Sequence, residues 1–108
     1  MMWVVLQSNP PLTLHRPGQR PATVTGKAIP ALLSAGTLRR RALADNNEIT
    51  NQVVEIANPA GALTAILSNS LNRSATVWSD ASGSAEALLA GTVARVRIGD
   101  SAALSIVA

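Results

Sequence analysis

Residues 45–80 constrain the fold of this chain more than any other stretch, because a strand signal, a turn signal and a helix signal follow one another there. From Glu48 to Ala57, β-branched side chains recur with a period of two, which is typical of a strand. The sequence Asn-Pro-Ala-Gly at 58–61 consists of turn-forming residues. The strand is therefore expected to end abruptly at this turn.

After the turn, the chain is expected to form a short amphipathic helix over about residues 61–70. A helix of that length is marginal by itself, so it must be held by packing its apolar stripe against a sheet. Apolar side chains recur at helical spacing at Leu63, Ile66, Leu67 and Leu71. We expect Leu63, Ile66 and Leu67 to form the core face of this helix.

The rest of the chain contains further strand-like segments separated by turn residues. An apolar run at residues 3–6 predicts a buried strand, and a hairpin is the simplest interpretation of residues 12–25. Pro30 favours an extended edge segment over residues 27–33, because proline cannot donate a hydrogen bond to a sheet ladder. Residues 37–43 are expected to form another strand or an irregular segment, and the remaining strand-like segments are residues 74–78, 88–98 and 103–107.

These segments add up to a mostly β protein with a single domain over residues 1–108. We expect a β-barrel or β-sandwich of six to eight short antiparallel strands with one short inserted α-helix. Residues 1–25 would supply an N-terminal strand and hairpin, and residues 26–108 would supply the remainder of the domain.

The core of such a domain must be built from small aliphatic side chains. Hydrophobic residues make up 47% of the chain, yet Trp3 and Trp78 are its only aromatic residues. Trp78 is expected to share one strand face with Thr76. Aliphatic side chains bury less area than aromatic ones, so a monomer is expected to be only modestly stable. Association with further copies would offset that deficit.

The sequence shows no constellation of residues typical of an enzyme. It has no cysteine, which excludes disulfides, thiolate metal sites and thiol nucleophiles. Its one histidine, His15, belongs to no recognisable catalytic motif and is expected on the surface. We therefore expect no catalytic activity, no cofactor and no metal. No apolar run approaches the roughly 18 residues of a membrane span, so we expect cytoplasmic synthesis and no membrane partner.

Arginines are the candidate interface residues of this basic chain, which has nine Lys/Arg against six Asp/Glu. The candidates are Arg39, Arg40, Arg41, Arg95 and Arg97. Adjacent strand residues point to opposite faces, so the three consecutive arginines do not form one flat patch. No aromatic residue is interleaved with them to stack nucleic-acid bases. Alternation also places Val93 on the face of the other two arginines. A solvated face or a face between subunits is favoured over nucleic-acid recognition.

The order of elements within residues 26–108 carries a resemblance to a known family. A strand ending near residue 58 is followed by a Pro/Gly turn, a short striped helix and the strand Ala-Thr-Val-Trp at 75–78. A loop then leads to Leu-Leu-Ala-Gly-Thr-Val at 88–93 and to a final hairpin. This order resembles the tube-type β domain of hub, baseplate and tail-tip proteins of tailed bacteriophages.

The resemblance implies a structural virion protein of a phage tail, tail tip or connector, made in the host cytoplasm. It implies a ring of identical copies, trimeric or hexameric, that contacts other phage tail proteins and performs no chemistry. The charge of +3 leaves open an alternative, a small basic β-barrel that binds nucleic acid.

Overall fold

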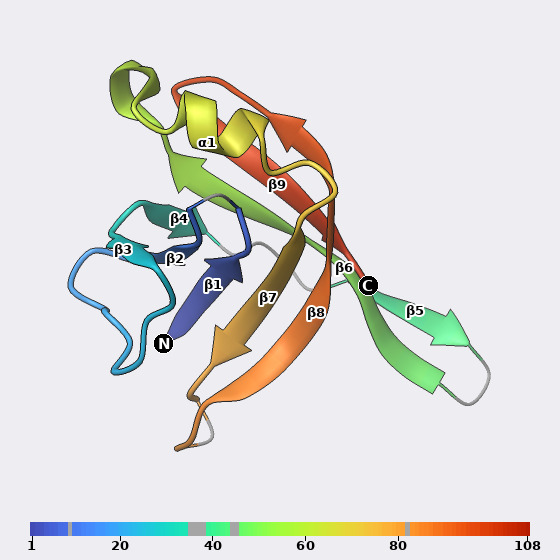
Figure 1. The fold of residues 1–108 in the computed structure, drawn as a ribbon. Coiled ribbons are helices and arrows are strands. Elements are labelled where there is room, and N and C mark those ends of the chain that lie inside the picture. Colours follow the sequence, from blue (N-terminus) through green and yellow to red (C-terminus); the bar gives the residue numbers. More distant parts are fainter. Residues whose placement is uncertain (9, 35–38, 44–45, 82) are drawn as a thin grey trace.

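A computed structural model describes the chain except for residues 9, 35–38, 44–45 and 82. For the other residues between 34 and 51 it describes the strand backbone but not the side chains. The described residues form nine strands and one short α-helix (Figure 1). The strands are β1 (Met2–Leu6), β2 (Leu12–His15), β3 (Lys27–Ile29), β4 (Leu32–Ser34), β5 (Arg39–Leu43), β6 (Asn46–Ala57), β7 (Ser74–Ser79), β8 (Glu86–Arg97) and β9 (Ser101–Val107). The helix α1 (Thr64–Ser68) follows a 3-10 turn, η1 (Pro59–Gly61).

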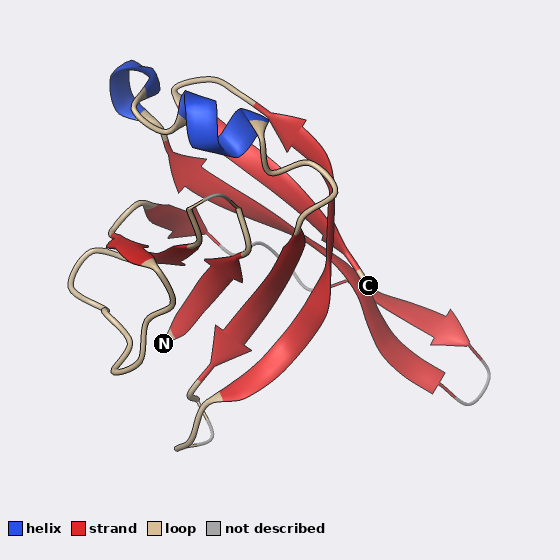
Figure 2. Ribbon diagram, in the orientation of Figure 1, coloured by secondary structure: helices blue, strands red, loops and turns tan. Residues whose placement is uncertain are grey.

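All nine strands belong to one sheet that curls into a nearly closed barrel (Figure 2). Eight of them follow one another in the order β3-β2-β1-β7-β8-β9-β6-β4, and β5 pairs with β6. The predicted class, a mostly β barrel with one short helix, is confirmed. Two features of the sheet were not part of the prediction, which expected short antiparallel strands throughout. The pairing of β2 with β3 is parallel, whereas all other pairings are antiparallel, and β6 and β8 are each 12 residues long.

Pro30 lies where the two ends of the sheet come together. The strands β3 and β4 are the first and last of the sheet order, and only Pro30 and Ala31 separate them in the chain. Proline has no N–H to give to a ladder, which explains why regular pairing stops here. Instead, the Ala31 carbonyl accepts a hydrogen bond from the Ala57 N–H at 2.7 Å. The extended segment predicted around Pro30 is therefore present as β3 and β4.

The predicted hairpin at residues 12–25 is wrong. Only β2 forms there, and the chain after it returns as a loop. The reason is the Thr13 hydroxyl, which takes the place of a backbone partner. Its Oγ1 donates to the Thr25 carbonyl at 2.8 Å and accepts from the Thr25 N–H at 2.7 Å. Gly26 then turns the chain at a φ of 64°, where a Cβ would lie 2.1 Å from the Pro11 carbonyl oxygen. This turn starts β3 parallel to β2.

The barrel interior is filled by aliphatic side chains, as the composition predicts. Along the described part of β6, alternate residues point inward, so that Val54 and Ile56 are buried while Val53 on the same strand is exposed. On β7, Ala75 and Val77 are buried, as the alternation predicts. The largest fully buried apolar side chains are Leu6, Leu12, Leu14, Leu32, Ile56, Leu67, Leu104 and Ile106.

The helix is shorter than predicted and lies over one end of the barrel (Figure 1). Leu67 is fully buried in the core cluster, and Leu63 and Ile66 are partly buried against it. These three residues form the core face, as predicted. Leu71, the last residue of the predicted stripe, lies beyond the end of α1 and its side chain is 48% exposed.

Asn58 ties the end of β6 to the helix and to the β8–β9 turn. Its side chain is buried, and its Nδ2 donates to Thr64 Oγ1 and to the Gly99 carbonyl, both at 3.0 Å. Its Oδ1 accepts from the Leu63 N–H at 2.7 Å. One amide therefore satisfies groups of two separate segments, a role that a turn residue chosen only for its conformation would not have.

We expect Asn58→Ala to lower the free energy of unfolding by about 2 kcal/mol, because it leaves buried polar groups without partners. The measurement is urea denaturation followed by circular dichroism. Asn69→Ala is the matched control, since the Asn69 side chain donates to the Ala65 carbonyl at an exposed position. Equal losses in the two variants would contradict the role assigned to Asn58.

Candidate functional surfaces

A two-stranded ribbon projects from the barrel (Figure 1). It consists of β5 and the first part of β6, paired from Arg39 opposite Asn51 to Leu43 opposite Asn46. In the described part of the chain, β6 pairs with β9 only from Asn51 onward. Residues 46–50 therefore have a ladder partner on the β5 side alone. Such an edge is a template for pairing with another chain, and a two-stranded ribbon by itself is marginally stable in water.

Three of the candidate interface arginines, Arg39, Arg40 and Arg41, lie on β5 of this ribbon. Their backbone positions are described, but the directions of their side chains fall outside the described structure. The pairing of β5 with β6 shifts register between Arg39 and Arg40. The prediction that these arginines contact another subunit stays a prediction.

The other two candidates, Arg95 and Arg97, lie together on the outer face of β8 and are exposed. A β-bulge between Val93 and Arg95 leaves Ala94 without a partner on β9. Because a bulge inserts one residue, it changes which face the following side chains occupy. Arg95 and Arg97 consequently lie on the exposed face while Val93 before the bulge is buried in the core, and the prediction that Val93 shares a face with the two arginines is wrong.

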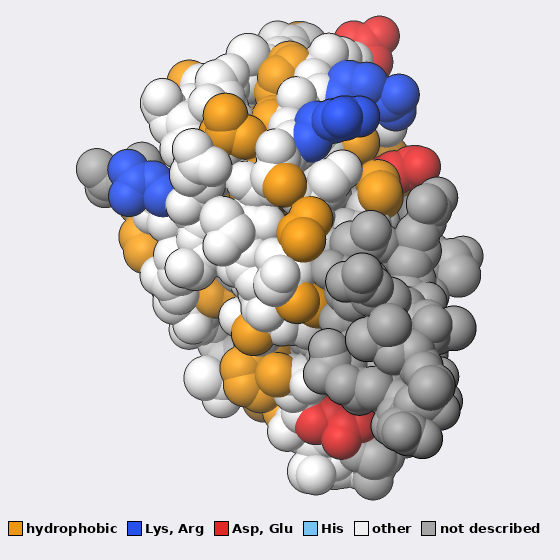
Figure 3. Space-filling view, turned by 90° about the vertical axis from the view of Figure 1, so that its right-hand side faces the viewer, with side chains coloured by type: hydrophobic (Ala, Val, Ile, Leu, Met, Phe, Trp, Pro, Cys, Tyr) orange, Lys and Arg blue, Asp and Glu red, His pale blue; other side chains and the backbone are white. Residues whose placement is uncertain are grey.

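Arg95 and Arg97 line a shallow groove of about 200 Å³ across β8, β9 and β6. Glu55 on β6 pairs with Ala103 on β9, which in turn pairs with Arg97. A carboxylate thus stands in the same row as one of the two guanidinium groups. Figure 3, a side view of the molecule, shows one group of basic side chains with acidic ones near it, and further basic and acidic side chains elsewhere on the same face. This mixed charge differs from the continuous basic surface of a nucleic-acid-binding protein.

His15 is buried, and its expected place on the surface is wrong. Its Nδ1 lies 2.8 Å from the carbonyl oxygen of Arg16, the first residue after β2. A carbonyl can only accept, so this nitrogen donates. Within the described residues, no group of three or more His, Cys, Asp or Glu side chains is arranged to hold a metal ion. None of the described helices is long and apolar enough to cross a membrane.

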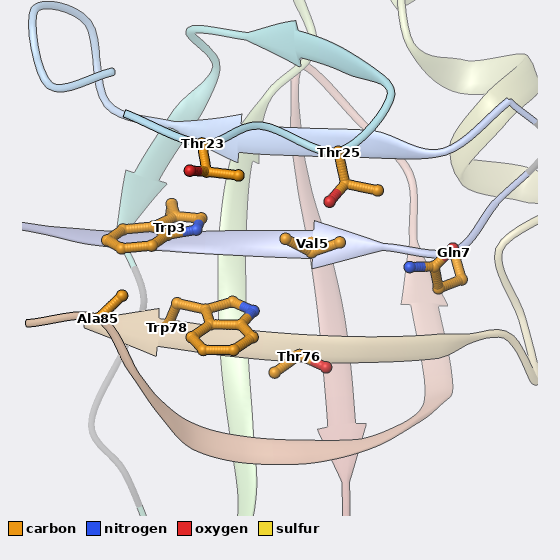
Figure 4. Close-up of a pocket in the computed structure, with 8 residues that line it drawn as sticks. All are labelled: Trp3, Val5, Gln7, Thr23, Thr25, Thr76, Trp78 and Ala85. Carbon is orange, nitrogen blue, oxygen red and sulfur yellow. The ribbon is translucent and has the colours of Figure 1, made fainter. Parts of the chain in front are cut away.

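The two tryptophans meet in a groove that the sequence patterns did not predict. Trp3 on β1 and Trp78 on β7 are direct cross-strand partners, and their rings lie 8° from parallel with centroids 6.4 Å apart. They line a groove of about 370 Å³ on the outer face of the barrel (Figure 4). Its other polar lining residues are Gln7, Thr23, Thr25 and Thr76. We call this the tryptophan groove.

No charged side chain lines the tryptophan groove among the described residues. The exposed arginines of β8 and the tryptophans of β1 and β7 therefore belong to separate surfaces, and the backbone of Arg39, Arg40 and Arg41 belongs to the ribbon. Comparisons of this chain with protein-family models, with curated proteins and with solved structures find no match.

Proposed function

We propose that this protein is a structural subunit of a bacteriophage tail, tail tip or connector and assembles with identical copies into a ring of three or six. The observation that carries the proposal is the ribbon of β5 and β6, which projects from a nearly closed barrel. Residues 46–50 present an edge without a ladder partner on the β9 side. A neighbouring copy that pairs with this edge would extend the sheet from one subunit to the next.

The composition of the core supports the same proposal. The buried cluster is aliphatic, so each subunit gains less from burial than a core with aromatic side chains would give. Contacts between copies add stability to subunits that associate. A closed ring also satisfies the edges of the ribbons that would otherwise remain open to uncontrolled pairing. Ring formation thus serves both stability and solubility.

The arginines of β5 are the side chains that we assign to this interface. Guanidinium groups form charge-assisted hydrogen bonds with carboxylates of a partner, and the backbone of β5 belongs to the ribbon that projects from the barrel. Exposed carboxylates available on another copy include Glu55 and Glu86. We do not propose nucleic-acid binding, because Glu55 interrupts the basic surface around Arg97.

The first test is the mass of the native protein by size-exclusion chromatography with light scattering, together with negative-stain electron microscopy. We expect discrete rings. Replacing Arg39, Arg40 and Arg41 together with serine is expected to shift the assembly toward monomers by at least tenfold in concentration, about 1.4 kcal/mol. We expect the barrel to remain folded, because the described core cluster is supplied by β1, β2, β4, β6, β7, β8, β9 and α1.

The matched control replaces three other arginines, Arg16, Arg20 and Arg73, with serine. Their side chains are exposed and lie away from the ribbon. This control removes the same charge, so it separates a specific interface from a general effect of net charge. A native protein that stays monomeric at high concentration would contradict assembly. Equal effects of the two triple variants would contradict an interface at the ribbon.

A further inference from the structure

Both aromatic residues of this chain, Trp3 and Trp78, line one groove. The sequence has two tryptophans and no tyrosine or phenylalanine. The cluster of buried side chains that forms the described core contains neither tryptophan. Large aromatic side chains ordinarily contribute most where they fill a core. Here both rings instead lie on the outer face of β1 and β7, next to each other.

A loop held by specific contacts completes the groove. Thr23 and Thr25 belong to the segment that follows β2, and this segment lies beside β1 in Figure 4. The reciprocal hydrogen bonds between Thr25 and Thr13 hold it down on the sheet. The turn at Gly26 fixes where it ends. Trp3 is only 7% exposed, whereas Trp78 is half-buried and accessible.

The lining of the groove selects a ligand by its chemistry. The accessible ring of Trp78 offers a flat apolar surface beside the nearly parallel, buried ring of Trp3. Three threonine hydroxyls and the Gln7 amide offer both donors and acceptors. Among the described lining residues there is no charge to pair with a phosphate or a carboxylate. Its volume of about 370 Å³ lies in the range of small-molecule sites.

We propose that the tryptophan groove binds a neutral saccharide. A pyranose ring presents C–H groups on its face, which are attracted to the negative face of an aromatic ring. Its hydroxyls at the edge match the threonine and glutamine groups around the tryptophans. A purely apolar ligand would leave these polar groups without partners, and an anionic one would find no counter-charge. This inference does not depend on the proposed ring assembly.

The native protein reports on this groove without a label, because Trp3 and Trp78 are its only tryptophans. The test is a fluorescence titration of the full chain with glucose, N-acetylglucosamine and their linear trisaccharides at millimolar concentrations. We expect a saturable change in tryptophan emission for at least one of these sugars. The same titration with adenosine and with a proline-rich peptide distinguishes other ligands that stack on tryptophan.

Thr23→Val and Trp78→Ala are the informative variants, and binding is measured by calorimetry. Trp78→Ala should weaken binding of the sugar at least about tenfold, since stacking on one aromatic side chain has an effect of that order. Thr23→Val keeps the size of the side chain and removes only the hydroxyl, so weaker binding there identifies a lost hydrogen bond. Thr92→Val is the matched control, because Thr92 is exposed on β8 and does not line the groove.

The proposal is overturned if no sugar of the panel gives a saturable response, or if adenosine or the peptide does so and the sugars do not. It is also overturned if Trp78→Ala, shown by circular dichroism to be folded, binds the sugar as tightly as the native protein does. Equal weakening by Thr23→Val and Thr92→Val would likewise exclude the groove as the binding site.

Discussion

Gly91→Ala is expected to lower the free energy of unfolding by about 3 kcal/mol or more. Gly91 lies on β8 opposite Ala75 of β7, close to the end of β9. A Cβ at this position would lie 2.2 Å from the Val107 carbonyl oxygen and 2.6 Å from its carbon. Those atoms belong to the backbone, so no side chain can rotate away to make room. Overpacking against a rigid neighbour has costs of this size.

The effect of Gly91→Ala is measured by urea denaturation, with Gly99→Ala as the control. At Gly99 the nearest atom to an added Cβ is 3.4 Å away, an ordinary contact, and the backbone does not have a positive φ. We therefore expect a change of no more than about 0.5 kcal/mol there. Equal stability of the Gly91→Ala and native proteins would show that β8 and β9 separate easily at this point.

Alternation of apolar and polar residues predicts those strands that have one face toward the core and the other toward solvent. Alternation along β6 and β7 reflects one face toward the core and one toward solvent, and the structure confirms it at Val54, Ile56, Ala75 and Val77. The helix is predictable for the same reason, because its apolar stripe has helical spacing. These signals are carried by residues close together in sequence, so they need no knowledge of the neighbouring strands.

Features that depend on distant residues were not predictable in this way. The bulge at Ala94 appears only when β8 is matched against β9, and it places Arg95 and Arg97 on the face opposite to that of Val93. The parallel β2–β3 pair depends on a side-chain hydroxyl, that of Thr13, replacing a backbone partner. Predictions from alternation and turn residues assume a continuous ladder of backbone hydrogen bonds. That assumption fails at the β8 bulge and at the β2–β3 pair.

For the candidate surfaces too, the features carried by local sequence were predictable, and those that depend on distant strands were not. The exposure of Arg95 and Arg97 follows from their positions on a strand and is confirmed. Their nearness to Glu55 depends on the order β8-β9-β6 in the sheet, in which β6 is distant in sequence. The tryptophan groove likewise requires β1 and β7 to be neighbours. The sequence nonetheless contained a signal for this groove. The chain has only two aromatic residues, and strand alternation places one of them, Trp78, on the same face as Thr76.

Leu67→Ala is expected to lower the free energy of unfolding by about 3 kcal/mol, and Leu71→Ala by no more than about 0.5 kcal/mol. Both substitutions remove the same atoms from the predicted helical stripe. Leu67 is fully buried in the core cluster, whereas the Leu71 side chain is 48% exposed beyond the end of α1. Denaturant titrations of the two variants under identical conditions provide the measurement.

The comparison also separates folding from assembly. The core contact of Leu67 lies at the end of the barrel covered by α1, while the proposed interface is the ribbon of β5 and β6. Leu67→Ala should therefore reduce the stability of the subunit and leave the size of the assembled ring unchanged in native buffer. Similar losses of stability for both leucines would mean that α1 is held by its whole stripe. A changed ring size would mean that the helix itself contacts a neighbouring copy.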